Sequence, residues 1–296
     1  MELRVLNYFL MVAREGNITR AANLLHLTQP TLSRQLIQLE QELGVTLFRR
    51  DKHRISLTEE GLLLRRRAEE ILLLSERTKE ELRSQEGKLS GTVFLGSGEL
   101  RSSRFLGMLV SDFHRIHPRV RFSLYSGNAD NIKERIEQGL LDIGLVPEPV
   151  NLDRYDYVLT PVRERWGALL SASSPLAQKE ALSPQDLRDM PLILPQREIV
   201  QGDLAHWFGE LWEKVDTVAS GNLLYNQAAL ARALGGCVLT MDLDSAFPDL
   251  KFIPLSPAIE VGTVLVWKKV QAFSPAAKAF LRHARSYILS ITDDGS

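Results

Sequence analysis

Residues 28–44 read TQPTLSRQLIQLEQELG, and they predict a single amphipathic helix. Thr28 is a favourable N-cap residue, and Pro30 suits the first turn because that turn needs no backbone donor. Three leucines follow at spacings of four and three residues and form one apolar face. Gly44 then ends the pattern, as glycine commonly ends helices.

The residues before this stretch predict two more helices. Apolar side chains recur at helical spacing over residues 3–13, and Gly16-Asn17 interrupts them before a second helix at about residues 18–25. The turn at residues 26–28 has the three-residue length that sets two helices at a steep angle. The order is therefore that of a helix-turn-helix motif.

After Gly44 the pattern changes to that of a two-stranded wing. Leu47-Phe48 leads into a basic turn at residues 49–54, and residues 55–57 alternate as a short strand does. Residues 1–58 carry eight basic and five acidic side chains, a net charge of +3, whereas the whole chain has a net charge of −1. The chain as a whole is thus not a highly basic protein that covers nucleic acid or membrane, but it has a local basic patch.

These features predict a DNA-binding surface. A helix fits the major groove, where the side chains of its first turn face the base edges. Arginine can bond guanine and glutamine can bond adenine, whereas serine, threonine and the amides at the helix start suit phosphate. Basic side chains of the wing can follow the DNA backbone or enter the minor groove. The predicted DNA-binding residues are Thr28, Gln29, Pro30, Thr31, Ser33, Arg34, Gln35, Arg50, Lys52, His53 and Arg54.

A long helix is predicted from Thr58 to about Gln85. Side chains at 64, 68, 71, 75, 78 and 82 recur at alternating spacings of four and three residues, the period of a coiled-coil seam. This stripe needs a partner, which is either the helix's own domain or a second chain, and we expect a second chain. The predicted dimerisation residues are Leu64, Ala68, Ile71 and Leu82. Residues 84–90 are polar and predict a hinge.

From residue 91 onward the sequence alternates between strand and helix patterns. This alternation predicts a parallel sheet with helices on both faces. The expected strands are 92–95, 120–125, 141–146, 168–170, 192–194 and 238–240, and the expected helices are 105–116, 129–138, 204–214 and 226–234. The pattern divides into two α/β lobes.

Composition and motifs exclude several other classes. A length of 296 residues suggests about two domains. There is no long uninterrupted apolar run and no signal-peptide pattern, so we expect a cytoplasmic protein without a membrane span. The single cysteine, Cys237, lies in an apolar run and is expected to be a buried structural thiol. No phosphate-binding loop or nucleophile elbow is present and the six histidines are scattered, so we expect no catalytic residues, metal or cofactor.

Several short motifs resemble one known family, the LysR-type transcriptional regulators. The resemblance is close over the N-terminal segment and continues more weakly along the rest of the chain. The matching residues are Ala21-Ala22, Leu25, Thr28-Gln29-Pro30, Leu32-Ser33-Arg34-Gln35, Leu39-Glu40, Leu43-Gly44, Leu47-Phe48-Arg49-Arg50, Leu57-Thr58-Glu59-Glu60-Gly61, Phe113, His117-Pro118 and Gly139-Leu140-Leu141-Asp142-Ile143-Gly144-Leu145.

The resemblance implies an α/β protein with an N-terminal winged helix-turn-helix and a two-lobed effector domain similar to periplasmic solute-binding proteins. The implied domains are 1–58 for DNA binding, 59–90 for the linker helix and hinge, and 91–296 for effector binding. Lobe I is about 91–162 plus 267–296, and lobe II is about 163–266. The implied partners are double-stranded DNA, a small-molecule effector, RNA polymerase, and further copies of the chain in a dimer and then a tetramer.

The effector is expected between the lobes, where strand ends meet. Family members often hold it with a hydroxyl or amide at the position of Leu100, and this leucine departs from that pattern. Arg101 and Arg104 are expected to receive a carboxylate on the effector, with Arg101 neutralising Glu99. The expected effector-binding residues are Ser97, Leu100, Ser102, Ser103, Ser126, Asn128, Pro147, Gln196 and Thr240, a set in which hydroxyls and amides outnumber apolar side chains. The alternative is that these serines only cap helices and that the cleft holds no effector.

One alternative stays open at this point. The chain could be a solute-binding or enzymatic α/β protein whose N-terminal helices only mediate oligomerisation. The signature at residues 28–34 and the basic wing favour DNA binding, because oligomerisation requires neither feature.

Overall fold

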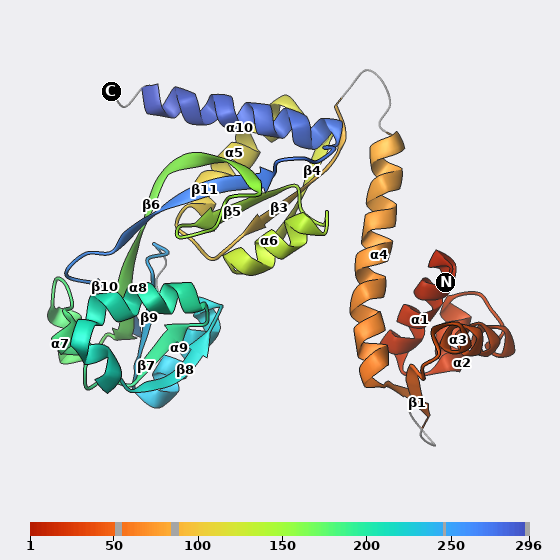
Figure 1. Ribbon diagram of the computed structural model, residues 1–296, viewed down its shortest axis with the longest axis horizontal. Coiled ribbons are helices and arrows are strands. Elements are labelled where there is room, and N and C mark those ends of the chain that lie inside the picture. The colour runs from red at the N-terminus through yellow and green to blue at the C-terminus, as the bar shows by residue number, and fades with distance from the viewer. Residues whose placement is uncertain (51–54, 84–88, 245–246, 294–296) are drawn as a thin grey trace. The chain divides into compact units, whose positions relative to one another are not determined.

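The computed structural model describes residues 1–50, 55–83, 89–244 and 247–293 of the chain (Figure 1). The chain divides into two compact units, Met1–Arg83 and Ser84–Ser296. Each unit has its own hydrophobic core.

The N-terminal unit is a winged helix-turn-helix followed by a long helix. Its elements are α1 (Leu3–Glu15), α2 (Ile18–Leu24), α3 (Gln29–Leu43), β1 (Phe48–Arg50), β2 (Ile55–Leu57) and α4 (Glu59–Arg83). The three leucines predicted to face inward on α3, Leu32, Leu36 and Leu39, are buried in one cluster with side chains of α1 and α2. The helical periodicity therefore predicted this core correctly.

Close backbone contacts join the wing to the long helix. The Thr58 hydroxyl donates a hydrogen bond to the carbonyl of Thr46 (2.7 Å) and accepts one from the amide of Gly61 (2.9 Å). A Cβ atom on Gly61 would lie 2.2 Å from the carbonyl oxygen of Leu47. Only glycine therefore allows the first turn of α4 to approach the wing this closely.

Alanine at Gly61 is expected to destabilise the N-terminal unit by about 1–3 kcal/mol, because the new methyl group meets backbone that cannot move easily. Gly107→Ala on a helix of the other unit is the matched control, since nothing lies within 4 Å of its added Cβ. Thermal unfolding of both variants tests this. Equal melting temperatures for the two variants would contradict the steric argument.

The C-terminal unit consists of two α/β lobes that share two long strands. Lobe I contains β3 (Gly91–Ser97), α5 (Ser103–Ile116), β4 (Val120–Ser126), α6 (Ala129–Glu137), β5 (Ile143–Pro147) and α10 (Pro275–Asp293). Lobe II contains η1 (Pro175–Gln178), α7 (Pro184–Leu187), β7 (Leu192–Pro195), α8 (Glu198–Phe208), η2 (Gly209–Lys214), β8 (Thr217–Gly221), α9 (Leu224–Leu234), β9 (Cys237–Met241) and β10 (Leu250–Pro254). The shared strands are β6 (Tyr155–Ser171) and β11 (Glu260–Lys268).

The sheet is mixed, so the expectation of a purely parallel sheet was wrong. The strand order is β4-β3-β5-β11-β6-β9-β7-β8, with β10 beside β6. The predicted strands β3, β4 and β5 pair in parallel, as do β7, β8 and β9. The shared strands β6 and β11 pair antiparallel with their neighbours because they carry the chain back and forth between the lobes.

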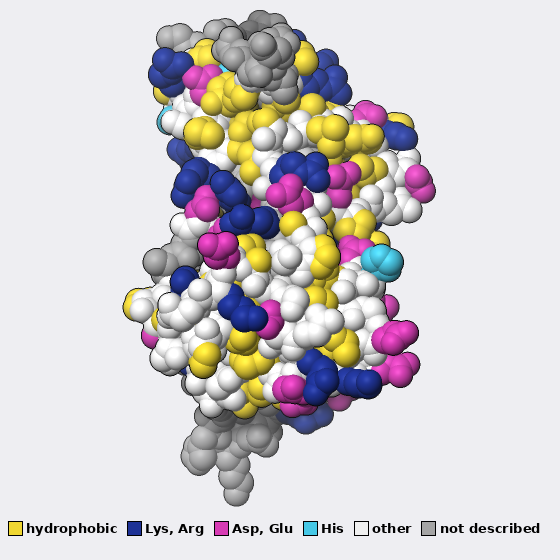
Figure 2. All heavy atoms as spheres, turned by 90° about the vertical axis from the view of Figure 1, so that its left-hand side faces the viewer, with side chains coloured by type: hydrophobic (Ala, Val, Ile, Leu, Met, Phe, Trp, Pro, Cys, Tyr) yellow, Lys and Arg dark blue, Asp and Glu magenta, His cyan; other side chains and the backbone are white. Residues whose placement is uncertain are grey.

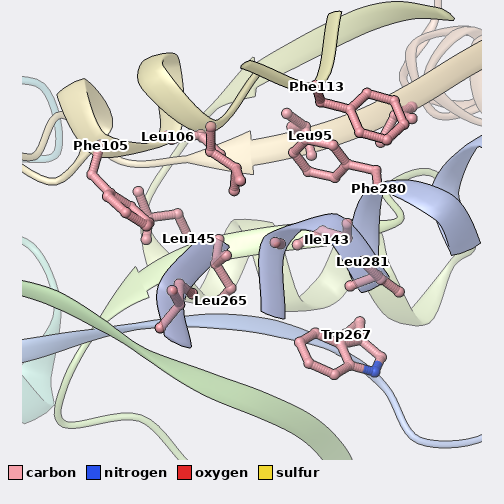
Figure 3. Close-up of a cluster of buried hydrophobic side chains, with 14 of the residues drawn as sticks. Leu95, Phe105, Leu106, Phe113, Ile143, Leu145, Leu265, Trp267, Phe280 and Leu281 are labelled. Carbon is pink, nitrogen blue, oxygen red and sulfur yellow. The ribbon is translucent and has the colours of Figure 1, made fainter. Parts of the chain in front are cut away.

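Helices cover both faces of the sheet in lobe I. Helices α5 and α10 cover one face and α6 covers the other (Figure 1). Figure 3 shows Phe113 and Leu106 of α5 packed with Phe280 of α10 over Leu95 and Leu145 of the sheet. The rings of Phe113 and Phe280 meet edge to face with centroids 5.2 Å apart. This core fixes the sheet whose strand ends carry the cavity described below.

Candidate nucleic-acid interface and effector cavity

The start of α3 is fixed by its own cap. The Thr28 side chain accepts a hydrogen bond from the amide of Thr31 (3.4 Å), and the two threonine hydroxyls lie 2.8 Å apart. His26, in the preceding turn, adopts a left-handed backbone conformation with φ of 55°. The amide of Leu27 bonds the carbonyl of Ala22 (2.9 Å), so the turn is tied back to α2.

The side of α3 that faces away from the core carries the predicted DNA-binding residues. Thr28, Gln29, Pro30, Thr31 and Arg34 are exposed, and Ser33 and Gln35 are half-buried. A shallow depression on this face is lined by Gln29, Pro30, Ser33, Arg34, Ile37, Gln38 and Gln41. The last three residues were missing from the predicted set. Ile37 and Gln38 lie three and four residues after Arg34, and Gln41 lies one further turn along, so helical spacing could have identified them.

The wing has the predicted strands. Phe48 pairs with Leu57 and Arg49 with Ser56, and the amide of Ile55 bonds the carbonyl of Gly16 at the end of α1 (3.2 Å). Arg49 is exposed. The predicted DNA contacts Lys52, His53 and Arg54, and the side chain of Arg50, lie outside the described residues.

The long helix α4 has two apolar faces, and the predicted dimerisation stripe lies mainly on the inner one. Ala68 is completely buried in the core of its own unit, and Leu64 packs against the same cluster. Ala68 is therefore not free to meet a second chain, which corrects the prediction for this residue, whereas Leu64 is only half-buried. Ile71 is 36% exposed at the edge of this face. The side chain of Leu82 lies outside the described residues.

A second apolar stripe lies on the other side of α4. Leu62, Leu63, Leu73 and Leu74 are 41–55% exposed. At 100° per residue, Leu62 and Leu73 share one face of the helix, Leu63 and Leu74 lie next to them, and all four point away from Ala68. This outer stripe was not recognised because the charges between its members hide its periodicity.

The C-terminal unit has a cavity of about 130 Å³ between the lobes. The cavity lies where β3, β4, β5, β7, β8 and β9 end, the usual ligand position of open α/β sheets. From lobe I it is lined by Gly98, Glu99, Leu100, Gly127, Asn128, Ala129 and Pro147. From lobe II it is lined by Trp166, Pro195, Gln196, Arg197, Val200, Gly221, Asn222, Leu223, Leu224, Gln227, Leu239, Thr240 and Met241.

Five of the predicted effector-binding residues line this cavity: Leu100, Asn128, Pro147, Gln196 and Thr240. Four predicted serines do not. Ser97 and Ser103 are bonded to each other (3.1 Å) and to the carbonyl of Gly98, and Ser102 is fully buried. Ser126 ends the edge strand β4 and is exposed. Ser97 and Ser103 thus stabilise the loop before α5, Ser126 lies at the surface, and the buried Ser102 hydroxyl has no hydrogen-bond partner among the described residues. Apolar side chains outnumber hydroxyls and amides on the lining.

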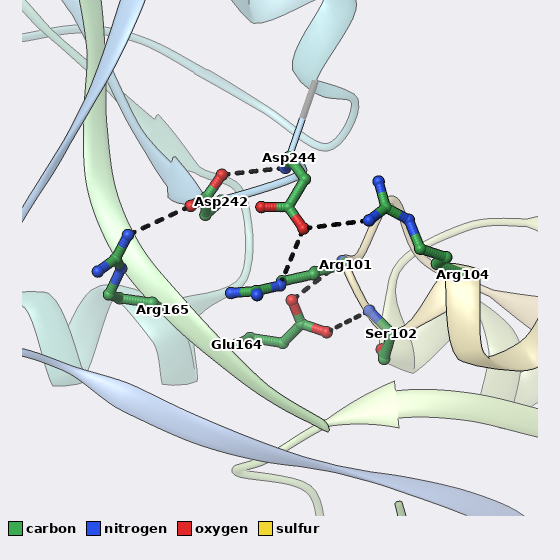
Figure 4. A network of polar contacts seen from close by, with 7 residues as sticks. All are labelled: Arg101, Ser102, Arg104, Glu164, Arg165, Asp242 and Asp244. Carbon is green, nitrogen blue, oxygen red and sulfur yellow. Dashed lines mark hydrogen bonds and ion pairs between the residues drawn. The ribbon is translucent and has the colours of Figure 1, made fainter. Parts of the chain in front are cut away.

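The two arginines expected to receive a carboxylate are bound to an acid of the protein itself (Figure 4). Arg101 lies 3.0 Å and Arg104 3.7 Å from the Asp244 carboxylate, and the Asp244 amide bonds Asp242 (3.0 Å). Neither arginine lines the cavity, and Arg101 pairs with Asp244 and not with Glu99. The structure therefore does not place Arg101 and Arg104 on the cavity lining, where the prediction required them.

The fully buried carboxylate of Glu164, on shared strand β6, holds the start of α5. It accepts hydrogen bonds from the amides of Arg101 (3.0 Å) and Ser102 (2.9 Å), as Figure 4 shows. A carboxylate at a helix start is favourable because the free amides and the helix dipole are positive there. Strand β6 is thus tied directly to the loop that lines the cavity.

The surface of the protein mixes charges of both signs. On the face shown in Figure 2, basic and acidic side chains lie close together.

Among the described residues, no group of three His, Cys, Asp or Glu side chains is placed to hold a metal ion. The described helices include none that is long and apolar enough to cross a membrane.

Cys237 is expected to be unreactive in the folded chain. Its side chain is fully buried in lobe II, and burial raises the pKa of the thiol from 9.0 to about 12. The thiolate fraction near pH 8 should therefore fall about a thousandfold relative to the unfolded chain, because the thiolate is the reactive form. Labelling with a disulfide reagent with and without urea measures this, and rapid labelling of the native chain would contradict it.

Two family models match different parts of the chain. Residues 3–62 match the family model for the bacterial regulatory helix-turn-helix protein, lysR family. Residues 86–288 match the model for the LysR substrate binding domain. The HTH-type transcriptional regulator YwbI of Bacillus subtilis (strain 168) is 30% identical, with 97% of each chain covered.

Further relatives are also regulators. The Hca operon transcriptional activator HcaR of Escherichia coli (strain K12) is 29% identical, with 99% of this chain and 100% of the relative covered. The crystal structure of full-length CbnR complexed with its target DNA has the same fold, with a TM-score of 0.74 over 97% of this chain and 99% of that chain at 23% identity. These comparisons favour a regulator with an effector-binding domain over an enzyme. The chain belongs to the LysR family of DNA-binding transcriptional regulators.

Proposed function

We propose that α3 reads DNA sequence in the major groove, that α4 pairs two chains, and that a small carboxylate in the interlobe cavity controls the regulator. The observation that carries the proposal is the exposed face at the start of α3. Gln29 and Arg34 are free of the core there, while the Thr28 cap and buried leucines hold the helix rigidly. Such a helix can present side chains to base edges without refolding.

Pairing of two chains rests on the outer stripe of α4, formed by Leu62, Leu63, Leu73 and Leu74. An exposed apolar stripe on a helix whose other face is already buried needs a second partner. A second copy of the chain fits best, because a two-fold dimer matches two DNA half-sites. A tetramer and a contact with RNA polymerase remain predictions.

The composition of the cavity supports a ligand with an apolar body. Trp166, Leu100 and Val200 provide apolar surface, and Asn128, Gln196 and Thr240 provide a few polar groups. Most small-molecule sites combine apolar walls with a few placed polar groups. We infer that the effector is a small metabolite with a short hydrocarbon part.

Two charged residues line the cavity, Glu99 and Arg197, and Arg197 favours a carboxylate on the ligand. Arg197 lines the cavity and its side chain is only 11% exposed. Its partner Asp130 is 62% exposed and does not line the cavity. The buried positive charge therefore acts on the cavity more strongly than the solvated negative one. No cofactor is needed for binding of this kind.

The effector proposal is tested by thermal-shift screening of the full chain against small carboxylates, each matched with its neutral amide. A true ligand at 100 times its dissociation constant should stabilise the fold by about 2.7 kcal/mol. The affinity of the chain for the hit should fall at least tenfold in the Arg197→Gln variant. It should stay unchanged in the Arg188→Gln variant, because Arg188 is exposed and lies outside the cavity lining. A hit that binds the Arg197→Gln variant with full affinity would contradict the carboxylate assignment.

A further inference from the structure

The first residue of α9 is capped by an acid from the opposite lobe. Glu99 follows β3 in lobe I, and its carboxylate accepts a hydrogen bond from the amide of Leu224 in lobe II (2.5 Å). The N-cap residue of α9 is Leu223, which makes no side-chain cap. The amide of Leu224, at the start of this helix, is therefore bonded by a group from across the cavity.

A second contact joins the lobes beside the same cavity. Arg197, at the N-cap of α8 in lobe II, donates to both carboxylate oxygens of Asp130 in lobe I (2.9 and 3.3 Å). Both Glu99 and Arg197 line the cavity. An entering ligand therefore meets two charged groups, and each of them already holds the opposite lobe.

The two contacts differ in strength. Arg197 is 11% exposed and makes two charge-assisted hydrogen bonds, whereas Glu99 is exposed and accepts one hydrogen bond from α9. A displaced Glu99 can be solvated at little cost, but a displaced Arg197 would leave a poorly hydrated charge inside the protein. The contact made by Glu99 is therefore the one that a ligand can replace.

We propose that Glu99 is a built-in competitor of the effector: its carboxylate caps α9 when no effector is bound, and the carboxylate of the effector takes its place. This inference rests on the proposed binding of a carboxylate in the cavity. Replacement breaks one contact between the lobes and leaves the Arg197–Asp130 contact in place. Effector binding is thereby coupled to a change in how the two lobes are arranged. Glu99 also determines which ligand charge the cavity selects and how tightly the effector binds.

The test uses the full chain with Glu99→Ala and requires no knowledge of the natural effector. The substitution removes the equivalent of one acetate group, so acetate is the probe. Hydrogen exchange followed by mass spectrometry over residues 220–232 should show about tenfold faster exchange at the start of α9, as expected for a lost helix cap. Acetate should restore at least half of the protection, whereas acetamide at matched ionic strength should not.

Two control variants, Glu180→Ala and Glu99→Gln, and a second readout accompany this experiment. Glu180→Ala removes an exposed acid that does not line the cavity, and it should leave exchange at α9 unchanged. Spin labels at Glu134→Cys on α6 and Asp203→Cys on α8 report the distance between the lobes, since both positions are exposed and Cys237 is buried. Glu99→Ala should broaden the distance distribution, and acetate should narrow it again.

Unchanged exchange and unchanged distances in Glu99→Ala would overturn the role of Glu99 as a cap between the lobes. Faster exchange that acetate does not reverse would overturn the replacement of its carboxylate by a ligand. Glu99→Gln, which keeps an oxygen acceptor without the charge, should give an intermediate exchange rate and guards against a folding defect in the alanine variant. Because these readouts use no natural effector and no DNA, they separate failure of this inference from failure of the proposed function.

Discussion

Leu63→Asp combined with Leu74→Asp is expected to dissociate the proposed dimer into monomers and to weaken operator binding by about 10² to 10⁴-fold. Both leucines are exposed on the outer stripe of α4, so the charges should not disturb the core of their own unit. Two joined DNA-binding heads bind two half-sites far more tightly than one, because the second binding event is intramolecular. Sedimentation velocity measures the association state, and fluorescence anisotropy measures the affinity.

The control places an acid on the same helix but away from the stripe. Lys79 is exposed about 160° around the helix from Leu63, and Lys79→Asp should leave the dimer intact. A double leucine variant that remains dimeric would show that another surface holds the chains together. Ala68, buried within its own unit, is unsuitable for this test because an acid there would unfold the DNA-binding unit.

Arg34→Ala is expected to cost about 1–3 kcal/mol of binding free energy at the cognate site and to relax the preference for the base that it reads. The side chain is exposed on the recognition face of α3, so the fold should be unchanged. Binding to random DNA should fall much less, because that binding depends on phosphate contacts.

Lys79→Ala provides the matched loss of one positive charge away from α3. The Lys79→Ala variant should have slightly changed affinities for cognate DNA and for random DNA, and the two changes should be similar in size. If Arg34→Ala lowered both affinities equally and left the base preference intact, Arg34 would contact phosphate and not a base.

The N-terminal unit could be predicted closely from sequence because its signals are local. Thr28 and Gly44 mark the two ends of α3, and the spacing of Leu32, Leu36 and Leu39 fixes which side is buried. Caps and helical periodicity each act within a few residues of sequence, so no knowledge of distant contacts is needed.

The faces of α4 could not be assigned in the same way. Both the inner stripe with Ala68 and the outer stripe with Leu63 are apolar, and periodicity alone does not tell which one meets the helix's own domain. The close approach of Gly61 to Leu47 fixes the rotation of the helix, and this is a contact between distant parts of the unit.

The cavity was predicted at the correct strand ends, and Asn128, Gln196 and Thr240 line it, but the four predicted serines do not. Serines near a helix start can bond either a ligand or the nearby backbone, and Ser97 and Ser103 bond the carbonyl of Gly98. The partners of Glu99, Arg101 and Arg197 lie 67 to 143 positions away in the sequence. Such pairings depend on the fold of both lobes and leave no local signal.

Selection of binding sites from a random duplex library with the purified full chain tests sequence-specific binding by α3 most directly. The expected result is an enriched motif made of two half-sites whose centres lie about 10 base pairs or a multiple of that apart. Arg34→Ala should lose the preference at one position of each half-site, and Leu63→Asp combined with Leu74→Asp should retain only weak selection of a single half-site. Recovery of all sequences in proportion to the starting library would contradict the assignment of α3 as the element that reads DNA.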